Sequence, residues 1–277
     1  MPADTLQLAD DLAAETRELE RLLEPLDAAG WELPTPAPGW AIRDQISHLA
    51  YFDEAATLAA VDPDRFRAER DAAFGAAAAE PASGGIDAFT EGIAMRARAL
   101  DVAAVHSWFR DARASMVRAL LSLDPGTRVP WYGPDMSVAS SLTARIMETW
   151  AHGQDVADAL EATRATTPAL RHVAHIGVRT LPNSFVTRGL EVPDTPVYVA
   201  LTSPEGASWM WGDPGATDRV EGHALDFCLV VTQRRHVADT KLAIHGPVAT
   251  QWMQIAQAFA GPPGAGRQPL RARAAPD

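Results

Sequence analysis

Glu148 and His152 are the residues whose types and spacing most readily suggest chemistry. They lie four positions apart in the segment METWAHGQDVADAL, 147–160. On a helix, two such side chains project next to each other from successive turns. Burying a carboxylate and an imidazole needs a reason, and a bound divalent metal is one. A plain hydrogen bond between the two side chains is the simpler alternative.

His48, in the segment PGWAIRDQISHLAYFDEA, 38–55, lies beside Leu49, near the predicted inner face (Ile42, Ile46, Leu49) of another helix. Two histidines and one carboxylate are a usual set for catalytic zinc, and they leave a coordination position open for water or substrate. A metal held this way could lower the pKa of a bound thiol or water and so produce a nucleophile at neutral pH. Nearby acids could orient the imidazoles. The candidates are Asp53, Glu54 and Asp155.

Helices must position these three residues, because apolar side chains recur around them at spacings of three and four. The helix that carries Glu148 and His152 has its predicted buried stripe at Val138, Leu142, Thr149, His152, Val156 and Leu160. Three other main helices are predicted at 4–29, 42–61 and 87–121, and shorter helical pieces at 62–79. Gly30 ends the first of them, and an interruption of the last is allowed near Val105. Proline-rich connections are predicted at 31–40 and 129–137, and a break at 81–85. Without a convincing strand before residue 165, an up-and-down four-helix bundle is the natural packing.

The pattern changes after Thr166, where strand signals begin. Residues 195–203 alternate apolar and polar side chains, and a Pro-Glu-Gly turn connects them to a plausible partner strand, ASWMWG. Helices are predicted at 168–188, 225–235 and 248–259, and a short strand at 242–245. The predicted domains are therefore a helical bundle at 1–165, a small α/β domain at 166–262 and a disordered tail at 263–277.

Composition narrows the class of protein. The 277 residues are 47% hydrophobic, enough for a substantial core, and the net charge is −12. An acidic chain lacks the basic face that nucleic-acid binding needs, and it disfavours anionic membranes. No segment approaches the roughly 18 apolar residues of a membrane span. A single cysteine, Cys228, and an acidic start without signal-peptide features favour a cytoplasmic protein. As partners we expect a small-molecule substrate and, at most, a second copy of the chain, so that the protein is a monomer or a homodimer.

The two ligand segments together resemble the mycothiol-dependent maleylpyruvate isomerase family, within the wider DinB-like metal-binding group. In that family a Gly-Trp turn leads into a helix bearing His-Leu-Ala, and a later helix bears Glu-x-x-x-His-Gly-x-Asp. The resemblance covers roughly residues 1–165. It implies a DinB-like four-helix bundle that holds a divalent metal, commonly Zn²⁺, through His48, Glu148 and His152. One departure is Ala41, which stands where the family often has a Ser or Thr cap and cannot accept that hydrogen bond.

The C-terminal half resembles the small α/β domain of the same family, which is similar to sterol-carrier-type folds. In the isomerases, an arginine of this domain faces the metal site. The local pattern Val-Thr-Gln-Arg makes Arg234 the candidate, with Arg235 and His236 as substitutes. An arginine suits a carboxylate substrate, which it can bind through two parallel hydrogen bonds. Cys228 lies in an apolar segment and is interpreted as a packing residue.

Three functions remain open from the sequence. The leading one is a metal-dependent thiol transferase or isomerase that uses a small cofactor thiol, such as mycothiol, on a small electrophilic or unsaturated acid. The second is a hydrolase or lyase acting through metal-bound water. The third is a non-enzymatic protein that binds a small ligand and carries a metal. A three-ligand site argues against a purely structural metal, because structural zinc usually has four protein ligands.

Overall fold

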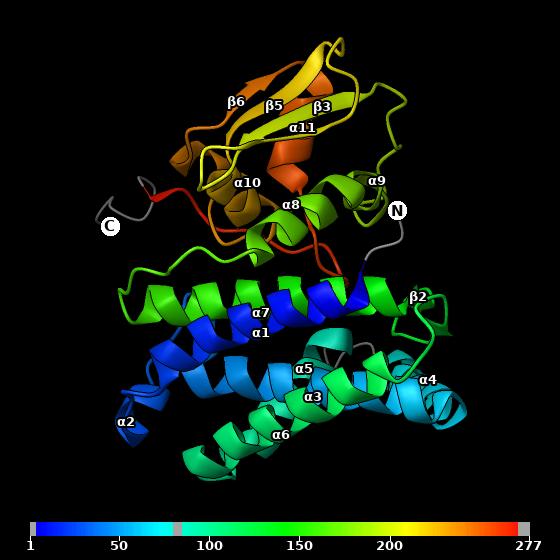
Figure 1. Cartoon of the computed structure of the whole chain (residues 1–277), viewed down its shortest axis with the longest axis vertical. Coiled ribbons are helices and arrows are strands. Elements are labelled where there is room, and N and C mark those ends of the chain that lie inside the picture. The colour runs from blue at the N-terminus through cyan, green and yellow to red at the C-terminus, as the bar shows by residue number, and fades with distance from the viewer. Residues whose placement is uncertain (1–3, 80–84, 271–277) are drawn as a thin grey trace. The chain divides into compact units, whose positions relative to one another are not determined.

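The structure is a computed structural model that describes residues 4–79 and 85–270, with side chains described for 4–75 and 89–270. It divides into two compact units, Met1–Thr167 and Pro168–Asp277 (Figure 1). Among the described residues, none of the helices combines the length and apolar character that crossing a bilayer requires.

The first unit is helical. Its helices are α1 (Thr5–Leu23), α2 (Ala28–Trp31), α3 (Ile42–Val61), α4 (Pro63–Ala79), α5 (Gly85–Arg98), α6 (Val102–Leu121) and α7 (Val138–Ala159). α3 packs against α6 and α7, and α1 packs against α7. The core between them includes Leu19, Ile46, Leu49, Phe109 and Val156, all fully buried. The apolar stripes predicted on α3 and α7 therefore do face this core.

Two predicted helices are each divided in the structure, and a side-chain N-cap begins the second part of each. The first predicted helix is split, since Asp27 accepts a hydrogen bond from Gly30 N (2.8 Å) and starts α2, which contains Gly30. The long helix at 87–121 is interrupted before Val105, where Asp101 caps α6 by accepting from Ala104 N (2.7 Å). The break predicted at 81–85 lies outside the described residues except for its last residue, where α5 begins.

The prediction of no strand before residue 165 is wrong. β1 (Arg128–Val129) and β2 (Met136–Ser137) form a short antiparallel pair at the start of α7. Ser137 ends this pair and caps α7, because its side chain accepts a hydrogen bond from Ser140 N (3.1 Å). The stiff proline-rich connection thus folds back on itself and fixes where the ligand helix begins.

The second unit is a mixed α/β domain. Its elements are α8 (Ala169–Arg179), α9 (Leu181–Val186), β3 (Val197–Thr202), β4 (Ser208–Trp211), β5 (Asp218–His223), α10 (Ala224–Val231), η2 (Val237–Asp239), β6 (Ala243–His245) and α11 (Pro247–Ile255). The sheet order is β4-β3-β5-β6, with β3 and β5 parallel and the other pairs antiparallel. Helices α10 and α11 pack against the sheet strands (Figure 1).

The β3–β4 hairpin and β6 confirm the predicted strands, whereas β5 was missed. The β5 sequence DRVEGH has one strongly apolar residue, Val220, and therefore no alternation to detect. It becomes a central strand because Val220 is fully buried and aligns with Val199 of β3. Part of the predicted disordered tail, 263–270, is bonded to this unit through Gly264 N to Gln257 Oε1 (3.0 Å) and Leu270 N to Asp239 Oδ2 (3.0 Å). Residues 271–277 lie outside the described residues.

Candidate metal centre

The structure brings together the three residues predicted as metal ligands. His48 comes from α3, and Glu148 and His152 come from successive turns of α7. One ligand atom of each lies within 4.8 Å of the others, and the two imidazole centroids are 4.5 Å apart. His152 is buried, while His48 and Glu148 are half-buried. A nitrogen, nitrogen and oxygen donor set of this kind can hold a divalent metal and leave positions open.

Positive groups around Glu148 keep its carboxylate charged. Burial alone would raise its pKa, but the hydrogen bond with His152 (Nε2 to Oε2, 3.3 Å) and the charges of His152, Arg145 and His48 lower the pKa of Glu148 to about 2. The sign of the shift is therefore decided by the neighbouring donors and charges rather than by burial. A carboxylate ligand must be ionised, so this environment suits metal binding at neutral pH.

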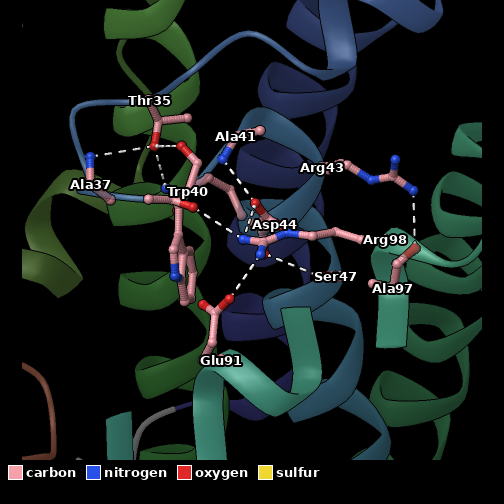
Figure 2. Close-up of polar contacts among 12 residues, drawn as sticks. Thr35, Ala37, Trp40, Ala41, Arg43, Asp44, Ser47, Glu91, Ala97 and Arg98 are labelled. Atoms are coloured by element: carbon pink, nitrogen blue, oxygen red, sulfur yellow. Dashed lines mark hydrogen bonds and ion pairs between the residues drawn. The ribbon is translucent and has the colours of Figure 1, made fainter. Parts of the chain in front are cut away.

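The first turn of α3, which positions His48, is held despite the missing cap at Ala41. Asp44 reaches back and accepts a hydrogen bond from Ala41 N (2.9 Å). Arg98 in turn donates two bonds to the Asp44 carboxylate, from Nε (3.0 Å) and Nη2 (2.9 Å) (Figure 2). This is half of a capping box: Asp44, the third residue of the helix, accepts a hydrogen bond from the backbone N–H of the cap residue, Ala41. The departure from the family pattern therefore leaves the helix start secured by another route.

Aromatic rings surround the two histidines. Trp40 stacks on His152 (6.1 Å between centroids, 18° between planes) and lies 5.3 Å from His48, while Phe52 lies 4.6 Å from His48. Trp131 contacts Phe52 (6.1 Å), Phe66 (6.0 Å) and Tyr132 (5.2 Å), and is therefore one ring removed from His48. Trp150, on α7, packs against the Arg164 guanidinium, which lies 5.5 Å from its ring centroid.

A cavity of about 660 Å³ lies beyond this aromatic layer, between α3, α4 and α6. Its walls include Tyr51, Phe66, Trp108 and Tyr132. The Tyr132 ring lies 5.5 Å from Phe52, which in turn contacts His48. The volume falls in the range of small-molecule sites, so the first unit offers space for a small organic ligand one ring away from the histidines.

The acid proposed to orient an imidazole, Asp53, serves another purpose. It is fully buried and accepts from Arg113 Nε (2.7 Å) and Arg145 Nε (2.8 Å). Glu54 is exposed, and Asp155 is buried on α7. His152 Nε2 faces Glu148, and its other ring nitrogen, Nδ1, has Gln45 Oε1 as its partner at 2.5 Å.

Sequence reasoning missed Gln45, although one signal was present. Gln45 lies three residues before His48, and its flanking positions Ile42, Ile46 and Leu49 form the predicted inner face of the helix. A polar side chain on a buried face is the pattern that should draw attention. A glutamine was not considered because acids are the commoner partners of a ligand imidazole.

Arg234 belongs to the second unit, where it follows α10. Its Nη1 donates to Thr232 O (2.7 Å) and its backbone N–H to Leu229 O (2.8 Å), and the side chain is half-buried. Its role near a metal stays a prediction. His236, named with Arg235 as an alternative to Arg234, caps η2 by accepting a hydrogen bond from Ala238 N (3.1 Å). Cys228 is fully buried and burial raises the pKa of its thiol, which agrees with a packing role.

Comparisons with known proteins cover most of this chain. A family model described as mycothiol maleylpyruvate isomerase N-terminal domain matches residues 12–157. Two curated relatives, from two strains of Mycobacterium tuberculosis, are each 45% identical over 265 residues, which covers 96% of this chain and 100% of the relative. Both are described as uncharacterised proteins.

Solved structures give the same fold. The crystal structure of a mycothiol-dependent maleylpyruvate isomerase matches with a TM-score of 0.56 and 17% identity, covering 84% of this chain and 90% of the isomerase. A histidine-to-alanine mutant of the mycothiol-dependent isomerase matches with a TM-score of 0.57 and 16% identity over the same shares. In the second unit, a model described as wyosine base formation matches residues 193–244. The sterol-carrier likeness is therefore replaced by a small mixed α/β domain that resembles this model.

Proposed function

We propose a function from one established premise: this chain belongs to the family of the mycothiol maleylpyruvate isomerase N-terminal domain. The proposed function is that of a divalent-metal-dependent thiol transferase or isomerase, which uses a small cofactor thiol of the mycothiol kind. Its substrate class is a small electrophilic or unsaturated acid. The observation that carries the proposal is the convergence of His48, Glu148 and His152 within 4.8 Å.

The donor set fits a divalent metal such as Zn²⁺. Glu148 Oε2 lies 3.3 Å from His152 Nε2, so an acceptor oxygen and a ring nitrogen face each other at a distance that a cation can bridge. When bound, such a metal supplies Lewis acidity, which lowers the pKa of a thiol or water that enters an open position. Three protein ligands, rather than four, favour a site with an exchangeable position.

The chain's own residues supply the surroundings of this chemistry. Trp40 and Phe52 cover the two imidazoles and limit the access of water to them. Reduced water access strengthens electrostatic interactions within the site. Arg145, three residues before Glu148, lowers the pKa of that carboxyl and so helps to keep it an anionic ligand.

Arg234 is the proposed group for holding the carboxylate of the substrate. We expect Arg234→Ala to retain metal and fold, and to weaken the binding of an anionic substrate by about 1.5–3 kcal/mol, the range for a hydrogen bond to a charged group. Arg234→Lys should recover part of this loss, because lysine lacks the planar fork. Unchanged binding of maleylpyruvate, the compound in the solved relative's name, by Arg234→Ala would remove this residue from the site.

Metal content tests the site itself. The full chain, incubated with Zn²⁺ and desalted, should retain about one metal per chain, and His48→Ala and His152→Ala should fall to background with unchanged circular dichroism. The matched control is His106→Ala, because His106 also pairs with a carboxylate, Glu20 (2.6 Å), but belongs to no three-ligand group among the described side chains. Retention of stoichiometric metal in both ligand variants would contradict the proposed site.

Thiol use is tested separately with the Co²⁺-substituted protein. Addition of mycothiol should produce a thiolate-to-cobalt charge-transfer band, which must be missing from His152→Ala. A Co²⁺ protein whose spectrum does not respond to thiol, but which hydrolyses activated esters, would favour the hydrolase alternative. A metal-loaded protein with neither response would favour a ligand-binding role.

A further inference from the structure

We propose that Gln45 is a positioning residue that fixes the tautomer of His152, so that Nε2 carries the lone pair directed at the metal centre. This inference rests on the proposed metal site and deepens it. It concerns a buried side chain outside the group of three candidate ligands. Four hydrogen bonds support it, which run from the loop before α3 through Gln45 to His152, each with a fixed donor and acceptor.

The first bonds fix the Thr35 hydroxyl. The loop is closed by a β-bridge between Pro34 and Ala41. Thr35 Oγ1 donates to Trp40 O (2.8 Å), and it accepts from Ala37 N (3.3 Å) (Figure 2). A hydroxyl has one hydrogen to donate, and a carbonyl can only accept. Thr35 can therefore only accept from any further partner.

That further partner is Gln45, and the Thr35 hydroxyl decides which end of the Gln45 amide faces it. Gln45 Nε2 lies 2.9 Å from Thr35 Oγ1, so the NH₂ end of the amide must face the threonine. The carbonyl end then faces the other way, where Gln45 Oε1 lies 2.5 Å from His152 Nδ1. The orientation of an amide is normally assigned from its partners, and here a threonine with no spare hydrogen allows one choice.

The histidine tautomer follows from this orientation. A carbonyl oxygen accepts only, so His152 Nδ1 must carry the hydrogen. In the neutral ring, Nε2 then has the lone pair, and it faces Glu148 Oε2 at 3.3 Å. Two acceptors at this distance repel each other unless a cation lies between them. In its neutral form His152 is therefore ready to bind a metal through Nε2, and it can donate to Glu148 only when the ring is protonated.

Burial makes this arrangement specific. Gln45 is fully buried, and an amide without partners would be costly there. Both ends of the Gln45 amide are hydrogen-bonded, so the amide cannot rotate without losing these bonds. The loop that supplies Thr35 also supplies Trp40, whose ring stacks on His152. One short segment thus determines both the plane and the tautomer of the ligand imidazole.

The tautomer can be measured without metal. In ¹⁵N-histidine-labelled, metal-free full-length protein, at a pH where the ring is neutral, two-bond ¹H–¹⁵N spectra should show the Nδ1–H form for His152. Gln45→Met keeps the volume but removes the acceptor, and it should convert His152 to a mixture or to the Nε2–H form. Gln45→Glu restores an acceptor at His152 and should restore Nδ1–H, although it loses the bond to Thr35, which can only accept. Finding Nε2–H in the wild type, or no change in Gln45→Met, would overturn the inference whether or not metal binds.

Metal affinity gives the second readout. By competition with a chromophoric chelator, Gln45→Met should bind Zn²⁺ about 10- to 100-fold more weakly, the usual effect of losing a partner of a ligand histidine. Thr35→Val should lose less, because Gln45 keeps its place but not its fixed orientation. The matched controls are Gln154→Met, whose amide bonds Asp158 (2.8 Å), and Thr143→Val, whose hydroxyl bonds Ala139 O (2.7 Å). Both should bind as wild type does.

The outcomes separate this inference from the proposed function. If the wild type binds no metal, the metal site fails, and the tautomer spectra still decide the role of Gln45. If the wild type binds metal and Gln45→Met binds it equally well with the Nδ1–H form retained, Gln45 is only a satisfied buried amide. Should Gln45→Met fail to fold, Gln45→Glu and Thr35→Val carry the test through the same spectra and titrations.

Discussion

Replacing Asp53 by Asn tests the buried charge cluster beneath the metal centre. Asp53 is fully buried on α3, and its carboxylate accepts one bond from Arg113 (2.7 Å) and one from Arg145 (2.8 Å). Both guanidiniums are nearly buried themselves. These three side chains comprise two positive groups and one carboxylate, and Asn would remove that carboxylate while keeping almost the same shape.

The expected loss follows from what remains. Arg113 would keep bonds to Thr16 Oγ1 (2.6 Å) and Thr149 Oγ1 (3.0 Å), and Arg145 would keep Leu49 O (3.3 Å). None of these partners carries a charge. Removing one member of a buried ion pair costs about 3–5 kcal/mol because the remaining charge is uncompensated. We expect Asp53→Asn to fall in this range, which is a large part of the about 5–15 kcal/mol by which proteins are stable.

Urea unfolding followed by circular dichroism measures this loss, with the slope of the transition compared between variants. The matched control is Glu54→Gln, which removes an exposed carboxylate from the next position of α3 and should change stability by no more than about 0.5 kcal/mol. Combining Asp53→Leu with Arg113→Met and Arg145→Met should recover most of the loss, since apolar groups can replace a buried charge cluster. A loss below about 1 kcal/mol for Asp53→Asn, at unchanged slope, would refute the reasoning.

Three further predictions concern packing, reactivity and metal linkage. Gly177→Ala should lower stability by about 1–3 kcal/mol in thermal unfolding, since its Cβ would meet Val231 Cγ2 at 2.7 Å and Phe227 Cε1 at 3.0 Å. Gly92→Ala, in open space on α5, should instead be neutral or stabilise by up to about 1 kcal/mol; equal effects of the two substitutions would contradict the packing argument. Cys228 should react with a disulfide reagent only after unfolding, because burial raises the pKa of its thiol, so rapid stoichiometric labelling of the native protein would show its environment to be open. Zn²⁺ should raise the melting temperature of the wild type but not that of His48→Ala, since a ligand of the folded state stabilises by mass action; an equal rise in both would point to binding elsewhere.

Local sequence patterns sufficed for the elements with strong periodicity or punctuation. The α3 helix at 42–61 and the β3–β4 hairpin were both predictable, because apolar spacing and turn residues act over a few positions. The same patterns failed where the deciding contact was distant. β5 has little apolar alternation, and it became a strand because neighbours from other segments cover its one apolar side chain.

The sequence by itself determined which residues could bind a metal. His48, Glu148 and His152 were identified from residue type, one-turn spacing and family resemblance, and α-helical geometry alone places the last two next to each other. Only the tertiary structure decided how those side chains are held. Asp53, an acid close in sequence, pairs with two arginines, and Gln45 takes the position against His152. The reason is physical: a hydrogen-bond partner is chosen by distance and direction after α3 and α7 pack, and sequence separation does not encode either.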